Sequence, residues 1–269
     1  MRKTVGVIVI ASNGYFPLGI RFIKRFDNFY RGDHAIKYFF FSNTSPYSCI
    51  SKDMARRVKH MPVIHESWVD STNSKFSGIK SINEVPEWRD IDYIYYFDAD
   101  TNISNPFTDW FIGDDLVGGE HFHSRKWTQE GPGSFPFERN EESQCFIPED
   151  TNRFLMYYYG AFFGGERNKV FDFCDTLIER QKKDKELGIE PIFNDESYIN
   201  HYFHYNMPKI IYTENFPFLV SCKGGIECFG TPEKGWLRDP NINIDSLIKT
   251  LERNKNETID VANGKIVVG

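Results

Sequence analysis

The chain has 269 residues, of which 40% are hydrophobic and 16% aromatic, so it is globular and long enough to bury a large core. No Pro-, Gly- or Ser-rich linker divides it, which favours one principal domain. With 32 Lys and Arg residues against 38 Asp and Glu residues the net charge is −6, and this balance, without a long basic run, argues against nucleic acid as a partner.

Cysteine usage and apolar runs indicate the compartment. The five cysteines are odd in number and form no C-x-x-C pair, which indicates reduced thiols rather than a disulfide framework or a zinc site. The apolar stretch near the N-terminus is too brief for a signal peptide. No segment reaches the ~18 apolar residues needed to span a membrane. We therefore expect a soluble, cytoplasmic protein without a transmembrane segment.

The first hundred residues alternate between strand and helix patterns. Runs of β-branched and aromatic residues predict core strands at 4–12, 35–42 and 57–64. Apolar residues at helical spacing predict a helix that follows the turn Asn13-Gly14-Tyr15 and runs to about Tyr30, and another helix over 71–85. The turn between the first strand and the first helix is a typical nucleotide-binding corner, although no G-x-G-x-x-G is present. The alternation predicts an α/β fold with a mostly parallel sheet.

The second half of the chain is less regular. A polar segment over 121–140 is expected to be a mobile loop. Gly160 and Ala161 interrupt an aromatic strand, where small residues let a ligand approach the backbone. The charged end of the helix predicted over 168–187, from Glu179 to Glu186, is expected to be solvated. In chain order the predicted elements are strands at 115–121 and 156–165, helices at 168–187 and 193–205, a strand at 208–213 and a short helix at 244–253.

The strand over 91–97 ends in two carboxylates, Asp98 and Asp100. It is apolar on both alternating faces, as expected in the middle of an α/β sheet, and its carboxyl end is where such sheets bind ligands. Residues i and i+2 of an extended chain project to the same side, so the two carboxylates can converge on one cation, and oxygen ligands suit Mg²⁺ or Mn²⁺. The pattern favours a metal and diphosphate site, although Asp is also common at strand ends for its turn-forming hydrogen bonds.

Asp195 and Glu196 stand at the expected start of the helix over 193–205. Asn194 or Asp195 can cap this helix, and acidic residues in a first turn interact favourably with the helix dipole. The local pattern leaves this structural role and a catalytic role equally open.

Three stretches in order resemble glycosyltransferase family six, the family of the histo-blood-group A and B transferases and α1,3-galactosyltransferase. They are YYYGAFFGG at 157–165, NDES at 194–197 with Asn200, and the less specific FERNEESQCFIPED at 137–150, while Asp98-Ala99-Asp100 falls at the family's D-x-D. The resemblance spans about residues 10–218. It implies a GT-A type fold, a mostly parallel twisted sheet flanked by helices, in a soluble member of bacterial or phage type. The catalytic domain would cover 1–220, with 221–269 a tail that is partly disordered or folds over the active site.

The resemblance implies roles for individual residues. Asp98 and Asp100 would hold Mn²⁺, with Mg²⁺ as the alternative, bridging the diphosphate of a UDP-sugar. The implied donor-binding residues are Ile10, Ala11, Tyr15, Lys75, Asp98, Tyr159, Gly160, Ala161 and Asp195. The implied acceptor-binding residues are His121, Phe193 and Glu196. Glu196 is also the implied catalytic residue, stabilising an oxocarbenium-like transition state by charge or by transient covalent attachment.

The implied reaction is retaining transfer of a hexose to a hydroxyl of a carbohydrate acceptor, the 3-hydroxyl of a galactoside in most known members. Tyr159 is bulky, and Ala161 carries a methyl group worth ~1–3 kcal/mol of discrimination in a packed pocket, so galactose is expected over N-acetylgalactosamine, with glucose as a rival. Phe193 replaces the Trp of better-known mammalian members and the tail has no match, so Lys223 or Lys234 would have to supply basic diphosphate contacts. The alternative from another class is a catalytically idle carbohydrate-binding protein on this scaffold.

Overall fold

The computed structural model describes residues 2–65, 67–86, 89–101, 103 and 106–212, together with the backbone of two strands near the C-terminus. These two strands, β8 (Glu257–Asp260) and β9 (Lys265–Val268), pair antiparallel with each other. The rest of the expected tail lies outside the described residues, including Lys223, Lys234 and the helix predicted at 244–253.

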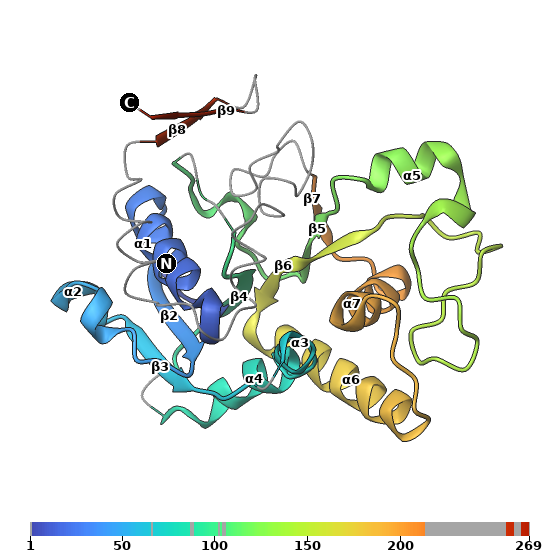
Figure 1. The fold of residues 1–269 in the computed structure, drawn as a ribbon, viewed down its shortest axis with the longest axis horizontal. Helices are drawn as coiled ribbons and strands as arrows, with labels where there is room; N and C mark the ends of the chain where they lie inside the picture. Colours follow the sequence, from blue (N-terminus) through green and yellow to red (C-terminus); the bar gives the residue numbers. More distant parts are fainter. Residues whose placement is uncertain are drawn as a thin grey trace.

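Seven strands in the part of the chain up to residue 212 form one sheet, in the order β3-β2-β1-β4-β6-β5-β7 (Figure 1). Among them β6 runs antiparallel to both of its neighbours, while the other neighbouring pairs are parallel. This confirms the predicted mostly parallel sheet. The strands are β1 (Thr4–Ile10), β2 (Ala35–Ser42), β3 (Val58–Pro62), β4 (Tyr93–Asp98), β5 (Val117–Glu120), β6 (Tyr158–Glu166) and β7 (Lys209–Ile211).

Helices cover both faces of the sheet, each over its own hydrophobic core (Figure 1). On one face α1 packs its aromatic residues on the sheet, with Phe26 edge-on to Phe97 at 5.6 Å between ring centroids. On the other face α4, α6 and α7 share a second core, in which Phe173 of α6 stacks on Phe203 of α7 at 5.2 Å. The helices are α1 (Phe16–Phe29), α2 (Lys52–Ala55), α3 (Trp68–Asn73), α4 (Lys75–Ser81), α5 (Ser124–Glu130), α6 (Arg167–Glu186) and α7 (Asn194–Tyr205).

Most of the predicted elements are confirmed to within a few residues of their ends, and the described cysteines, Cys49, Cys145 and Cys174, are free thiols. One expected helix over 71–85 is instead two helices, α3 and α4, that meet at Ser74. The break matters because it places Lys75 at the first position of α4, buried under the sheet edge.

Two further expectations are wrong. The segment over 121–140 contains α5, and its aromatic residues Trp127, Phe135 and Phe137 pack around Tyr157 in a small third core, so it is not simply a polar loop. The charged end of α6 is not wholly solvated, because Asp184 is fully buried. The carboxylate of Asp184 accepts hydrogen bonds from the Ser143 and Tyr198 hydroxyls, which satisfy the buried charge.

Candidate active site

The carboxyl ends of β1 and β4 lie side by side at the centre of the sheet. The chain runs outward from β1 through β2 to β3 and then returns to the other side of β1 with β4, which makes this edge the topological switch point where open α/β sheets bind ligands. Ile10 at the end of β1 pairs directly with Asp98 at the end of β4. The residue expected in a nucleoside pocket and the first expected metal ligand are therefore neighbours across the sheet.

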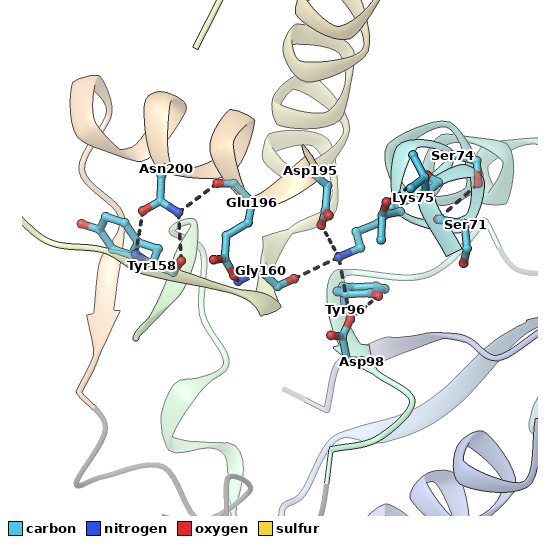
Figure 2. Close-up of polar contacts among 12 residues, drawn as sticks. Ser71, Ser74, Lys75, Tyr96, Asp98, Tyr158, Gly160, Asp195, Glu196 and Asn200 are labelled. Carbon is cyan, nitrogen blue, oxygen red and sulfur yellow. Dashed lines mark hydrogen bonds and ion pairs between the residues drawn. The ribbon is translucent and has the colours of Figure 1, made fainter. Parts of the chain in front are cut away.

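Lys75 is the centre of a buried polar network at this edge (Figure 2). Its side chain is 5% exposed, and its Nζ lies 2.5 Å from Oδ2 of Asp195 and 3.7 Å from Oδ1 of Asp98. The same nitrogen donates a hydrogen bond to the Gly160 carbonyl at 3.1 Å and lies 4.4 Å above the ring of Tyr96. Burial opposes the charge, but the two carboxylates outweigh it and raise the pKa of Lys75, so the ammonium stays protonated.

Asp98 is partly exposed, with 39% of its side chain accessible, and accepts a hydrogen bond from the Tyr96 hydroxyl at 2.6 Å. Burial raises the pKa of Tyr159, and the charges of Asp100 and Asp98 raise it further, which places both carboxylates near that phenol. No cluster of three or more His, Cys, Asp and Glu side chains that could bind a metal occurs in the described residues. Two carboxylates fit a hard cation that takes its other ligands from substrate oxygens and water, the usual mode of Mg²⁺-type ions at phosphates.

Glu196 binds the backbone of β6. Its Oε2 accepts a hydrogen bond from the Gly160 amide at 2.7 Å (Figure 2). A Cβ atom on residue 160 would stand 2.9 Å from that oxygen, so glycine is required for the carboxylate to come this close. Burial raises the pKa of Glu196 to about 7, with the hydrogen bond from Gly160 acting in the opposite direction. Gly160 was expected to let a ligand approach the backbone of the strand. In the structure it lets the Glu196 side chain approach.

The start of α7 holds Asp195 and Glu196 toward β6 and α4. The prediction that Asn194 or Asp195 caps this helix is wrong: the N-cap residue is Phe193, and no side-chain cap is made there. Asn194 has a φ of +44°, a conformation that Asn tolerates better than most residues. The carboxylate of Asp195 instead accepts a hydrogen bond from Lys75.

Asn200 fixes α7 against β6. Its Oδ1 accepts a hydrogen bond from the Tyr158 amide at 2.7 Å, and its Nδ2 donates to the carbonyls of Tyr158 at 3.0 Å and Glu196 at 2.9 Å (Figure 2). The amide therefore pairs with one residue of the strand much as a neighbouring strand would, and it also holds the first turn of the helix. Sequence reasoning singled out Asn200 in a motif but gave it no role.

An aromatic group lies beside the network. His121 is buried, its ring stacks on Trp127 at 5.1 Å and it contacts Tyr159 at 5.1 Å. Its Nδ1 accepts a hydrogen bond from the His123 amide at 3.2 Å, so in the neutral ring the proton is assigned to Nε2. Burial, with the nearby His123, lowers the pKa of His121 to about 3, and the imidazole is neutral at physiological pH.

Tyr157 contributes a hydroxyl that sequence reasoning missed. The side chain is 1% exposed and its ring packs edge-on to Trp127 at 5.2 Å. The hydroxyl makes no hydrogen bond within 3.5 Å, yet it lies close enough to the Glu196 carboxylate to lower the pKa of that group. Only its place two residues before Tyr159, on the same side of an extended chain, could have indicated it.

The remaining expected residues lie around this edge. Ala11 is fully buried and its methyl group faces Gly19 of α1, so it could meet a ligand only through its main chain. Tyr15 precedes α1 and packs against the first core. Phe193 is 43% exposed at the start of α7. Ile10 lines an open pocket of about 330 Å³ together with Phe41, Val63, Ile64, His65, Asp70, Ser74, Ser77 and Gly78.

A mostly parallel sheet with paired carboxylates at its switch point, and an acidic pair on the adjoining helix, is the arrangement of a GT-A type glycosyltransferase domain. The chain belongs to glycosyltransferase family 6, whose family model matches residues 1–218. The expected family and fold class are thereby confirmed.

Three relatives illustrate the range of similar proteins. The human globoside alpha-1,3-N-acetylgalactosaminyltransferase 1 is 25% identical over 218 residues, covering 80% of this chain and 61% of its own length. The histo-blood group ABO system transferase 1 of Rattus norvegicus is 26% identical over 218 residues, covering 79% and 60%. The O-antigen biosynthesis glycosyltransferase WbnI of Escherichia coli is 24% identical over 156 residues, covering 54% and 59%. The chain thus spans about 60% of the length of these relatives. None of its described helices has the length and apolarity that a membrane crossing requires.

Proposed function

We propose that this protein is a metal-dependent, retaining hexosyltransferase that moves galactose from UDP-galactose to a hydroxyl of a carbohydrate acceptor, the 3-hydroxyl of a galactoside. The observation that carries the proposal is the network around Lys75. It joins Asp98, the first proposed metal ligand, to Asp195 and, through the Gly160 backbone, to Glu196. A binding protein without catalysis has no use for such an array of buried charges, which is expensive to desolvate.

The pocket beside Ile10 suits the nucleoside. Its volume of about 330 Å³ lies within the range of roughly 300–1,000 Å³ typical of ligand pockets. Ile10 and the Phe41 ring provide apolar contact, while Asp70 and Ser77 add polar groups at the wall. A nucleoside seated here extends its diphosphate along the end of β1 toward Asp98, its neighbour in the sheet.

The metal site would be formed by Asp98 and Asp100. A Mn²⁺ ion, or Mg²⁺ in its place, neutralises the diphosphate and makes UDP a competent leaving group when bound there. The Lys75 ammonium balances the negative charge of Asp195 and Asp98 on the protein side. It thereby reduces the repulsion between the two carboxylates that share it.

Glu196 would act on the reacting carbon. As the bond to UDP breaks the sugar acquires positive charge, which a carboxylate stabilises either by its charge or by transient attachment. The Gly160 amide holds the carboxylate at a fixed position, and a preorganised charge needs no reorientation during the reaction. With a pKa of about 7, Glu196 is largely ionised only above neutral pH.

The aromatic group around His121 would bind the acceptor. Flat faces such as Trp127 suit the apolar face of a sugar ring, and the Nε2–H assigned to His121 can donate to a hydroxyl. Tyr159, whose ring contacts His121, separates this region from Ala161 on the donor side. The bulk of Tyr159 and the methyl of Ala161 support galactose over N-acetylgalactosamine, even though the human relative is named for the latter.

A UDP-release assay tests the proposal. The protein is incubated with UDP-galactose, UDP-N-acetylgalactosamine or UDP-glucose and a β-galactoside, with Mn²⁺ or with a chelator. We expect UDP release that requires the metal and is fastest with UDP-galactose. Binding of glycans without UDP release from any donor would instead support the idle carbohydrate-binding protein, which the aromatic group around His121 also suits.

A further inference from the structure

His65 bridges two segments at the edge of the proposed nucleoside pocket. Its Nδ1 lies 2.8 Å from the hydroxyl of Ser12, two residues after the end of β1, and its Nε2 lies 2.9 Å from the hydroxyl of Ser74, at the start of α4. Its main-chain carbonyl accepts a third hydrogen bond, from Nδ2 of Asn13 at 3.1 Å. The residue is 9% exposed, so these bonds are mostly shielded from water.

Both ring nitrogens of His65 are engaged. A neutral imidazole donates at one nitrogen and accepts at the other, so one of the two serine hydroxyls donates to His65 and the other accepts from it. Burial lowers the pKa of His65 and so favours this neutral form. Each ring nitrogen therefore has a hydrogen-bond partner.

The two bridged segments carry different parts of the proposed donor site, and His65 and Ser74 also line the pocket beside Ile10. Ser12 follows Ile10 and Ala11, the residues assigned to the nucleoside. Ser74 immediately precedes Lys75, whose ammonium contacts Asp98 and Asp195 at the sugar end. The apolar residues of α4 pack in the same core as Ile10 of β1, and the bridge through His65 adds directional bonds between the two segments.

We propose that His65 is a positioning residue that sets the distance between the nucleoside end and the Lys75 end of the donor site. The inference depends on the proposed function, because it takes the donor to be a UDP-sugar. A ligand that spans both ends gains from the fixed spacing, since the two halves of the site need not be ordered on binding. A ligand that occupies only the nucleoside pocket meets His65 and Ser74 but not Lys75, and so gains less affinity from the fixed spacing.

Two variants interrupt the bridge at different points. His65→Leu removes both side-chain bonds, and Ser12→Ala removes one of them without changing the lining of the pocket. The matched control is His60→Leu. His60 on β3 also bonds a serine, Ser42, at 3.3 Å, but it pairs with Phe40, whose side chain belongs to the core on the α1 face, away from the pocket.

The measurements are dissociation constants for uridine monophosphate and for UDP-galactose with Mn²⁺, on variants whose melting curves show that they are folded. One neutral hydrogen bond corresponds to roughly 3- to 10-fold in affinity. We therefore expect Ser12→Ala to weaken the binding of UDP-galactose by that factor, and His65→Leu to weaken it by roughly 10- to 100-fold. The affinity for uridine monophosphate should change less than about threefold in Ser12→Ala. It should fall in His65→Leu, which alters the lining of the pocket, but by less than the affinity for UDP-galactose, and His60→Leu should change the affinity for neither ligand.

The outcomes separate the two proposals. In folded Ser12→Ala, equal losses for both ligands or an unchanged affinity for UDP-galactose would overturn the positioning role of His65 while leaving the transferase intact. A parent protein that binds neither uridine monophosphate nor UDP-galactose would refute the proposed function itself, and the role of His65 with it.

Discussion

Replacing Glu196 with Gln separates a catalytic from a structural role. The substitution keeps the shape of the side chain, and its carbonyl oxygen can still accept the hydrogen bond from the Gly160 amide. It removes the charge and the titration. If Glu196 serves the chemistry, its charge is held at a cost to stability, and the variant should be more stable and less active than the parent.

The size of the stability effect follows from the pKa. A rise from the ordinary 4.5 to about 7 is a difference of about 2.5, which at ~1.36 kcal/mol each corresponds to at most about 3.4 kcal/mol. Because Glu196 is partly exposed, we expect about 1–2 kcal/mol after solvent screening. The folded protein binds the proton of Glu196 more tightly than the unfolded chain does. Protonated Glu196 therefore contributes fully to the free energy of unfolding below about pH 4.5, and this contribution is lost as the pH rises through about 7.

The assay is denaturant unfolding at pH 5 and pH 8 together with steady-state kinetics. The Gln variant should be more stable than the parent by about 1–2 kcal/mol at pH 8, with a much smaller difference at pH 5. Its kcat should fall by about 10²–10³ while UDP still binds with Mn²⁺, and the rise of kcat/KM through about pH 7 expected for the parent should disappear.

Asp195→Asn is the contrasting control, because it removes the nearest counter-charge of the buried Lys75 and should destabilise the protein at both pH values. A Glu196→Gln variant that is less stable than the parent at pH 8, with normal kcat, would refute the reasoning and make Glu196 a structural residue.

Three further substitutions test the other parts of the site. Asp98→Asn should lose metal-stimulated UDP release, because removing a metal ligand costs several kcal/mol of transition-state stabilisation. Equal rates with Mn²⁺ and with chelator in the parent would count against the metal assignment. Gly160→Ala places a Cβ 2.9 Å from Oε2 of Glu196, so kcat should fall roughly 10-fold or more with a near-normal KM for the donor; unchanged kcat would show that the close approach is unnecessary. Ala161→Gly should raise kcat/KM for UDP-N-acetylgalactosamine relative to UDP-galactose by roughly 10-fold, and a parent that already prefers the N-acetylated donor would contradict the pocket argument.

The sequence predicted the framework well because its signals are local. The strand that ends at Asp98 is apolar on both faces, and the structure places it in the middle of the sheet between β1 and β6. The helical spacing of apolar residues likewise predicted the position of α1. Patterns of this kind depend on the burial of nearby residues and need no knowledge of distant contacts.

The remaining features depend on contacts between distant residues. The sequence pattern places Asp184 in a charged helix end that is expected to be solvated. Its burial is explained only by its hydrogen bonds to Ser143, 41 residues away, and to Tyr198. The sequence pattern around Glu196 fits a structural role in the first turn of a helix as well as a catalytic role. The structure adds its hydrogen bond to Gly160 in another element. The bridge through His65 has no signal in the sequence, because a lone His between two Ser-containing turns is common.

The most direct test of the central claim is the anomeric configuration of a transferred sugar. The parent is incubated with UDP-galactose, Mn²⁺ and a β-galactoside, and the disaccharide product is examined by NMR, with Glu196→Gln as the matched control. The account predicts a new galactose linked in the α configuration, formed by the parent with Mn²⁺ and strongly reduced in the variant. A β-linked product, or release of free galactose without transfer, would contradict it.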